Sequence, residues 1–209
     1  MPNAAEWWVY LGAALLIAFA PGPGILYVLA RSIRGGSREG VRSAFGNSLG
    51  ASVHVLAAAV GLSALLMASA VAFTVVKLIG AAYLVYLGVR ALWELRKGSA
   101  EPGEGSPRQR GSAVVQGFFS ELFNPKTAVF FLAFLPQFVH PEQGSATPAF
   151  LLLGSVFVLF TLGADLLVAA FAGPLAARLA RNPRWWRRQQ VVSGGTLIGL
   201  GGALALSQN

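Results

Sequence analysis

Residues 20–24 read Ala-Pro-Gly-Pro-Gly and residues 124–126 read Asn-Pro-Lys, and each stretch lies inside a long apolar run. Proline has no backbone N–H, so continuous helical hydrogen bonding cannot pass through either stretch. Interrupted backbone at membrane depth is tolerated only where it is buried in protein or lines a cavity. We therefore predict two broken helices that face inward; a simple kink in each helix is the alternative.

The composition of the whole chain indicates a membrane protein. Of its 209 residues, 55% are hydrophobic and only 11% are charged, against about 25% charged in an ordinary soluble domain. Because so few charged residues cannot cover a water-facing surface, most of the surface must face lipid. The absence of cysteine also excludes a disulfide framework and a thiolate metal site.

Six apolar runs are long enough to cross the hydrocarbon core, which needs roughly 20 helical residues. They cover residues 6–29, 43–69, 71–93, 113–139, 148–177 and 190–206. We predict an all-α, polytopic membrane protein with six transmembrane helices in two inverted three-helix repeats, because an odd number of spans inverts the second half. The single transporter domain, 1–209, would divide into a first half (1–95), a cytoplasmic linker (96–112) and a second half (113–209).

The basic residues predict the orientation of these spans. Fourteen of the 16 lie in three of the connecting segments, namely Arg31, Arg34, Arg38 and Arg42, then Arg90, Arg96, Lys97, Arg108 and Arg110, then Arg178, Arg181, Arg184, Arg187 and Arg188. The positive-inside rule puts these segments in the cytoplasm and both termini in the periplasm. The net charge of +8 therefore indicates topology and not nucleic-acid binding.

Further topological signals lie at the start of the chain. No Lys or Arg precedes the first apolar run, so it lacks the basic region of a cleavable signal peptide and we expect it to be retained. Trp7, Trp8 and Tyr10 are typical of an aromatic belt at the outer interface.

Four ionisable residues, Lys77, Lys126, Glu121 and Asp165, lie within the apolar runs. Each costs about 2.5–3.5 kcal/mol at the bilayer centre on insertion scales, so it faces a partner or a pathway by default. Lys77 is near the outer end of its span and is expected to extend to the interface. Glu121 either belongs to the pathway or faces its cytoplasmic entrance.

Depth along the helices connects several of these positions. At about 1.5 Å per residue, Pro21 lies roughly 12 Å, Asn124 roughly 16 Å, His54 roughly 17 Å and Asp165 roughly 18 Å from the cytoplasmic ends. Four polar or helix-breaking features from four spans share one layer, which favours a single central cavity. Paired interruptions in corresponding segments indicate a transporter binding site at the repeat interface.

An amino acid would present a carboxylate and an ammonium to such a cavity. Lys126, the amide of Asn124 and the helix start after Pro125 are suited to the carboxylate. Asp165 and the carbonyls near residues 21–23 are suited to the ammonium, and Asp165 is also the candidate proton carrier because desolvation favours its neutral form. Two alternatives stay open: a structural ion pair between Asp165 and Lys126, and a hydrogen-bonded core role for His54 in place of a proton relay.

Five stretches together are similar to the LysE/RhtB family of amino-acid exporters, and the similarity covers almost the whole chain. They are Pro-Gly-Pro at 21–23, the glycine-flanked segment 46–50 after a basic loop, Gly-Ala-Ala-Tyr-Leu-Val-Tyr-Leu-Gly at 80–88, Asn-Pro-Lys at 124–126 and Phe-Leu-Pro-Gln-Phe at 134–138. The Asn-Pro-Lys motif followed by Leu-Pro-Gln-Phe is the most specific of these.

This resemblance implies a proton-driven secondary exporter of amino acids, or of analogues such as homoserine lactone, in a bacterial inner membrane. The family usually has Asn after Pro-Gly-Pro, where this chain has Gly24, and Asn47 in the next helix is the candidate to supply the missing amide. The predicted substrate-binding residues are Pro21, Gly22, Pro23, Gly24, Asn47, Asn124, Pro125 and Lys126. The predicted proton-coupling residues are Asp165, Glu121 and His54.

Other functional classes have weaker support. An intramembrane enzyme would need a nucleophile elbow or a zinc-binding His pair, which the sequence lacks. An inorganic or metal cation exporter would want several acidic or histidine ligands and no nearby Lys126. A passive channel stays open, and it would not need Asp165 as a proton carrier. We predict no cofactor and no bound metal; the expected partners are the solute, the lipid bilayer, the proton gradient and, through glycines near 194–202, possible homodimer contacts.

Overall fold

The protein is all-helical in its described part. The computed structural model describes residues 2–62, 70–96, 111–140, 144–171 and 183–206, although some side chains within these helices are not described. The elements are α1 (Ala4–Phe19), α2 (Pro23–Ala57), the π-helical segment η1 (Ala58–Leu62), α4 (Ala70–Arg96), α5 (Ala113–Leu122), α6 (Pro125–Val129), the π-helical segment η2 (Phe130–Phe134), the 3-10 helix η3 (Leu135–Phe138), α7 (Ala146–Phe171) and α9 (Pro183–Leu206).

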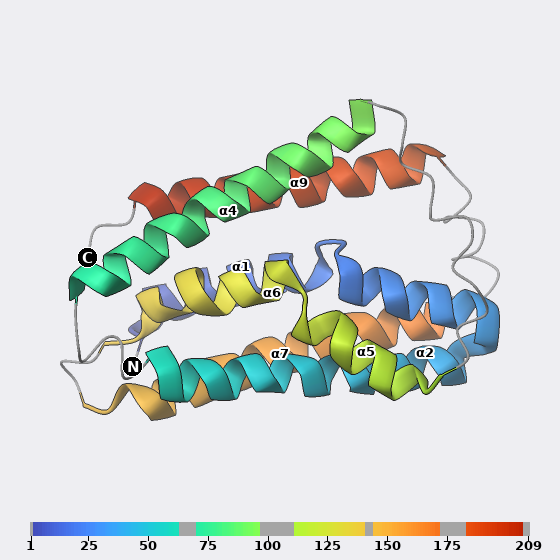
Figure 1. Ribbon diagram of the computed structural model, residues 1–209, viewed down its shortest axis with the longest axis horizontal. Coiled ribbons are helices and arrows are strands. Elements are labelled where there is room, and N and C mark those ends of the chain that lie inside the picture. Colours follow the sequence, from blue (N-terminus) through green and yellow to red (C-terminus); the bar gives the residue numbers. More distant parts are fainter. Residues whose placement is uncertain (1, 63–69, 97–110, 141–143, 172–182, 207–209) are drawn as a thin grey trace.

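The helices form three layers in Figure 1. One layer is the pair α4 and α9, which pack along each other. The middle layer holds α1 and the α6–η2–η3 run, and the third holds α2, α5 and α7, with α2 packed against both α5 and α7. One part of each interrupted helix, α1 and α6, is therefore enclosed between the other two layers (Figure 1), where irregular backbone can be sheltered from lipid.

Three stretches of the described chain are long and apolar enough to cross a membrane. They are Pro23–Leu62, Ala146–Phe171 and, taken together, the pair Ala113–Leu122 and Pro125–Phe138, which bends by 45° at its break. Shorter apolar helices occur at Ala4–Phe19 and Leu78–Arg90. The expectation of an all-helical membrane protein is confirmed at this level.

The first predicted connection differs from expectation, because most of it is helical. Residues 30–42 were expected to form a loop, but α2 continues through them, and only Gly36 has non-helical angles, with φ 78° and ψ 174°. A positive φ is open to glycine without the clash that a Cβ would bring. At this point α2 turns back on itself, so two helices meet with almost no loop (Figure 1).

An aromatic core fills one end of the bundle. Phe130, Phe134, Phe150 and Phe157 are all buried there, and Phe130 stacks on Phe157 with ring centroids 4.2 Å apart. Tyr10 belongs to this core as well: it is fully buried and its hydroxyl donates to the Leu153 carbonyl. Its expected place in an interfacial belt is therefore wrong, because the phenol finds an internal acceptor.

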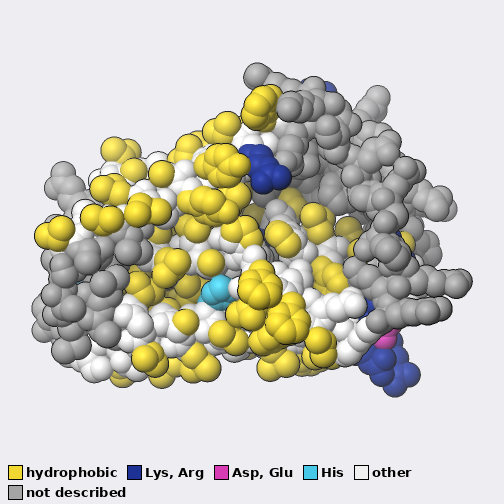
Figure 2. Space-filling view, in the orientation of Figure 1, with side chains coloured by type: hydrophobic (Ala, Val, Ile, Leu, Met, Phe, Trp, Pro, Cys, Tyr) yellow, Lys and Arg dark blue, Asp and Glu magenta, His cyan; other side chains and the backbone are white. Residues whose placement is uncertain are grey.

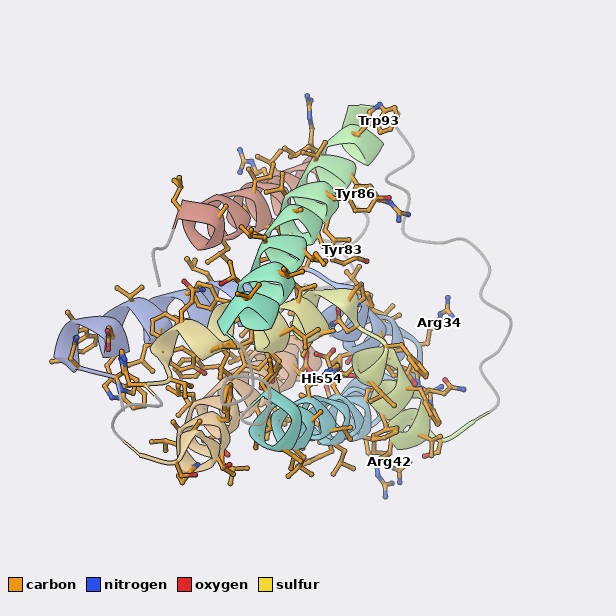
Figure 3. The ribbon with its side chains drawn as sticks, turned by 60° about the vertical axis from the view of Figure 1, so that its left-hand side comes forward. Arg34, Arg42, His54, Tyr83, Tyr86 and Trp93 are labelled. Atoms are coloured by element: carbon orange, nitrogen blue, oxygen red, sulfur yellow. The ribbon has the colours of Figure 1, made fainter. Side chains whose placement is uncertain are left out.

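The outer surface is apolar, as lipid contact requires. Large exposed hydrophobic side chains occur on every layer, among them Val60, Ile79, Phe123 and Leu159. Figure 2 shows such side chains spread over the face that it presents. On α4 the exposed side chains include Tyr83, Tyr86 and Trp93, which extend outward in Figure 3.

Glycines allow the helices of two pairs to approach closely. In the α2–α5 pair, a Cβ on Gly46 would overlap the Val114 carbonyl, and one on Gly50 would lie 2.5 Å from the Phe118 carbonyl. In the α4–α9 pair, a Cβ on Gly88 would lie 2.6 Å from the Gly194 carbonyl. Small residues at contacts are the usual means of helix packing in membranes. Gly194 is thus used within the chain, while Gly195, Gly199 and Gly202 face open space.

Two sequence expectations fall on parts that are not described. Most of the predicted linker, at residues 97–110, lies outside the described residues. The side chain of Lys77 is also outside the described part of the chain.

Candidate functional site

The first interruption lies between α1 and α2. Ala20 ends α1 with extended angles (φ −64°, ψ 126°), Gly22 is extended as well, and Pro23 begins α2. Proline suits the first position of a helix because its missing N–H would have no partner there. The result is a helix C-terminus whose carbonyls face the inside of the protein.

The second interruption lies between α5 and α6. Phe123 ends α5, and Asn124 caps α6 by accepting a hydrogen bond from the Lys126 amide at 3.1 Å through its side chain. Pro125 takes the first helical position, as Pro23 does in α2. The two breaks therefore have the same local design, in which a short extended stretch is followed by proline.

Lys126 joins the two breaks. Its side chain is buried, and its Nζ donates to the Ile17 carbonyl at 3.0 Å and to the Ala20 carbonyl at 2.8 Å. A cation is stabilised there because the C-terminus of a helix carries partial negative charge. Gly22 lies against the same side chain, since a Cβ on it would be 3.2 Å from Nζ.

Glu121 is a second buried charged group, at the end of α5. One carboxylate oxygen accepts from Asn124 Nδ2 at 2.9 Å, and the other accepts from the Thr127 hydroxyl. His54 contacts the same residue, with its Nε2 3.2 Å from the Glu121 carbonyl oxygen. The carboxylate at the end of α5 is thus held by the cap residue and by a side chain of α6 across the second break.

Asp165 enters the site from α7. It is buried, and its Oδ2 accepts from Asn47 Nδ2 at 2.9 Å. Asn47 is also buried, and within the described part of the chain its Oδ1 accepts no hydrogen bond. A buried acceptor without a donor is uncommon in folded proteins and asks for an explanation.

Gly24 connects the Glu121 and Asp165 groups. A Cβ on it would overlap Oε2 of Glu121 and would lie 3.0 Å from Asn47 Nδ2. No side chain fits between these polar groups, so glycine lets α2 pass directly over them. The amide of Asn47 thus reaches the space that a side chain at position 24 would fill.

We define the polar network as two hydrogen-bonded groups that lie on either side of Gly24. The first is Asn47 and Asp165, and the second is His54, Glu121, Asn124, Lys126 and Thr127. It brings together the polar side chains expected from the sequence, while Pro21, Gly22, Pro23 and Pro125 shape the backbone around it. No ion pair between Lys126 and Asp165 occurs in the described structure. Figure 3 shows His54 near the middle of the bundle, whereas Arg34 and Arg42 extend outward.

Sequence reasoning missed three members of the site. Thr127 directly follows the Asn-Pro-Lys motif, and a hydroxyl beside a buried lysine was a usable signal. The backbone carbonyls expected to act as acceptors were those near residues 21–23, whereas the carbonyls that Lys126 contacts belong to Ile17 and Ala20, earlier in the chain. They carry no side-chain signal, because backbone acceptors become specific only through packing. The described residues hold no group of three His, Asp or Glu side chains arranged for a metal ion.

A comparison with known families decides the classification. The LysE type translocator family matches residues 15–208, almost the whole chain. This chain belongs to that family. The resemblance drawn from the motifs is confirmed, and the protein is a multi-pass membrane translocator and not an enzyme.

Individual LysE-type relatives agree along most of their length. A homoserine/homoserine lactone efflux protein of Salmonella typhimurium is 31% identical, with 98% of each chain covered. A leucine efflux protein of an Enterobacter species is 32% identical over 75% of this chain and 74% of its own. An uncharacterized membrane protein of Vibrio cholerae is 31% identical, with 97% of each chain covered. No solved structure matches this chain.

Proposed function

We propose that this translocator exports an amino acid or a close derivative across the bacterial inner membrane, in exchange for protons. The observation that carries the proposal is the polar network: a buried lysine bound to helix-end carbonyls and two buried carboxyl groups lie where two membrane helices are interrupted. Groups of both charges in one enclosed place suit a zwitterion. The printed names of the relatives, which include homoserine and leucine efflux proteins, agree with this class of substrate.

The proposed topology has six spans in two inverted halves, 1–95 and 113–209, joined by a cytoplasmic linker at 96–112, with both termini in the periplasm. The distribution of arginine and lysine supports this orientation. The matching breaks support two related halves, because each half opens with a span that is interrupted before a proline. Discontinuous helices in corresponding segments are a common feature of such transporters.

For the substrate carboxylate, we propose Lys126 together with Asn124 and the start of α6. For the ammonium, we propose the Ile17 and Ala20 carbonyls, which Lys126 occupies in this conformation, with the free Oδ1 of Asn47 as a further acceptor. When a zwitterion binds, its ammonium would take the place of the Lys126 ammonium at these carbonyls. Its carboxylate would then pair with the released Lys126. Such an exchange leaves no buried charge unpaired.

Asp165 is our first choice for the coupling proton, with Glu121 and His54 as the other members of the set. Asp165 accepts one amide hydrogen bond, whereas the Glu121 carboxylate is held by two side-chain donors. The group with fewer donors loses less hydrogen bonding when it becomes neutral. Proton entry at Asp165 would accompany release of the ammonium to the periplasm.

The test is transport in proteoliposomes loaded with a mixture of labelled amino acids under an imposed pH gradient. The proposal expects at least one amino acid to leave faster than from protein-free vesicles, and expects this flux to collapse with the gradient. Asp165→Asn should abolish gradient-driven efflux while the protein still inserts and stays monodisperse. If the rate of efflux through the unmodified protein did not depend on the pH gradient, proton coupling would be refuted.

A passive channel is the second candidate, and the same variant separates the two. A channel has no need of a proton carrier, so Asp165→Asn would leave its downhill flux intact. A cation exporter is disfavoured by Lys126, whose buried ammonium would repel a cation in the same network.

A further inference from the structure

An apolar cavity of about 260 Å³ lies beside the polar network. One wall comes from α2 and η1, and the facing wall comes from α6 and η2. The described lining residues are His54, Ala57, Ala58, Gly61, Leu62, Ala128, Phe131 and Leu132. Among these described residues, only His54 has a polar side chain. The volume approaches the lower end of typical small-molecule pockets, about 300 Å³.

Both π-helical segments contribute to this cavity. Gly61 belongs to η1 and Phe131 to η2, and the two segments face each other across it. A π-turn widens a helix by one residue and occurs often at functional sites. Two such turns at one cavity are unlike ordinary close-packed membrane helices, in which the space would be filled.

The cavity adjoins the polar network directly. Ala128 in its wall follows Thr127, whose hydroxyl donates to Glu121. His54 at its edge lies with Nε2 3.2 Å from the Glu121 carbonyl and stacks on Phe131 at 5.9 Å between centroids. The cavity and the polar network therefore share His54.

We propose that this cavity receives the side chain of the transported amino acid, and that the substrates are therefore amino acids with branched aliphatic, thioether or aromatic side chains. This inference rests on the proposed function. The described part of the lining holds no Asp, Glu, Lys or Arg to pair with a basic or acidic side chain, and its Ala, Gly, Leu and Phe residues favour apolar atoms. A short hydroxylated side chain would leave most of the space empty and gain little.

The test fills the cavity from either wall. A Cβ on Gly61 meets no atom within 4 Å, so Gly61→Leu places a side chain in open space without displacing its neighbours. Ala128→Leu adds a larger side chain from the facing wall, where Ala128 lines the cavity. The matched control is Gly12→Leu, since Gly12 also has nothing within 4 Å but lies on α1 away from the cavity. Efflux of labelled leucine, methionine, homoserine and alanine is measured side by side in proteoliposomes.

We expect the unmodified protein to prefer leucine and methionine to alanine and homoserine by about 10-fold or more, as a fitted apolar pocket discriminates. Gly61→Leu and Ala128→Leu should abolish most of this preference, with alanine efflux retained and Gly12→Leu unchanged. Equal losses for all four solutes, or an unchanged preference, would overturn the inference and indicate a structural or lipid-filled cavity. Failure of every amino acid to move would instead refute the proposed function itself.

Discussion

Lys126 is the residue on which the interior of the protein most depends. Its ammonium has two backbone acceptors, both from the end of α1, and Gly22 leaves room for it. A lysine buried in this way is stable only while those carbonyls face it, because a buried cation without partners is very costly. The same arrangement explains how a solute ammonium could take its place.

Replacing Lys126 tests this directly. Lys126→Met keeps the length and apolar part of the side chain but removes the charge, so we expect amino-acid efflux to fall by at least 10-fold while insertion is normal. The control is Arg42→Met, an exposed arginine whose ion pair with Glu39 lies at the surface. Normal efflux in Lys126→Met would contradict a role for the ammonium in substrate binding.

Gly24 gives a second test at the residue scale. A Cβ there would overlap Glu121 Oε2, so Gly24→Ala must push the carboxylate away from Asn124 or shift α2. Overpacking of this kind typically costs about 1–3 kcal/mol. We expect a lower thermal midpoint in detergent and a larger loss of efflux, compared with Gly12→Ala, whose new methyl group meets no atom within 4 Å. Equal behaviour of the two variants would mean that Glu121 moves aside freely.

At the scale of elements, the short helix α6 depends on its cap. The side chain of Asn124 accepts from the Lys126 amide and donates to Glu121, so one residue holds both the helix start and the carboxylate. The prolines alone would interrupt the helices, but they would not direct the freed groups toward each other. The capping asparagine is what turns the second break into part of a site.

Asn124→Ala should therefore do two things at once. Loss of an N-cap costs about 1 kcal/mol in typical helices, and Glu121 loses one of its two side-chain donors. We expect a modest fall in thermal midpoint and a severe fall in efflux. Asn124→Ser, which can still cap, should recover the stability but not the hydrogen bond to Glu121. Recovery of full efflux by the serine would show that capping alone matters.

At the scale of the whole molecule, the separate layer of α4 and α9 and the Gly36 turn set how the helices are arranged around the two breaks. The α4–α9 pair packs through Gly88 and Gly194, and it meets the interrupted helices through η2 and α6. This leaves α1 and α6 between a tight pair on one side and α2, α5 and α7 on the other (Figure 1). The layered arrangement suits movement of one group of helices against another around a central site.

The membrane topology can be measured by cysteine labelling, because the chain has no native cysteine that would also react. Single cysteines placed near each terminus and in the 97–110 segment should react differently with a membrane-impermeant thiol reagent applied to intact cells. We expect labelling at both termini and none in the segment until the membrane is permeabilised. Labelling of the segment in intact cells would reverse the proposed orientation.

Much of the architecture could be predicted from local sequence alone. The apolar composition, the two proline-containing interruptions and the inward-facing polar residues follow from rules that need no partner, since a helix cannot continue through Pro21, Pro23 or Pro125. The start of α5 at Ala113 and the end of η3 at Phe138 also fall close to the ends of the predicted span 113–139. The expected loop at residues 30–42 was wrong, because a single glycine with positive φ replaced it.

Only the tertiary structure decided which groups meet. Lys126 contacts the Ile17 and Ala20 carbonyls and not Asp165, and Asp165 instead receives the Asn47 amide from α2. These contacts join residues more than a hundred positions apart, so they depend on how helices pack and on glycines that permit close approach. Local sequence determines where a membrane helix must break, because the backbone rule acts within a few residues; long-range packing determines what fills the break.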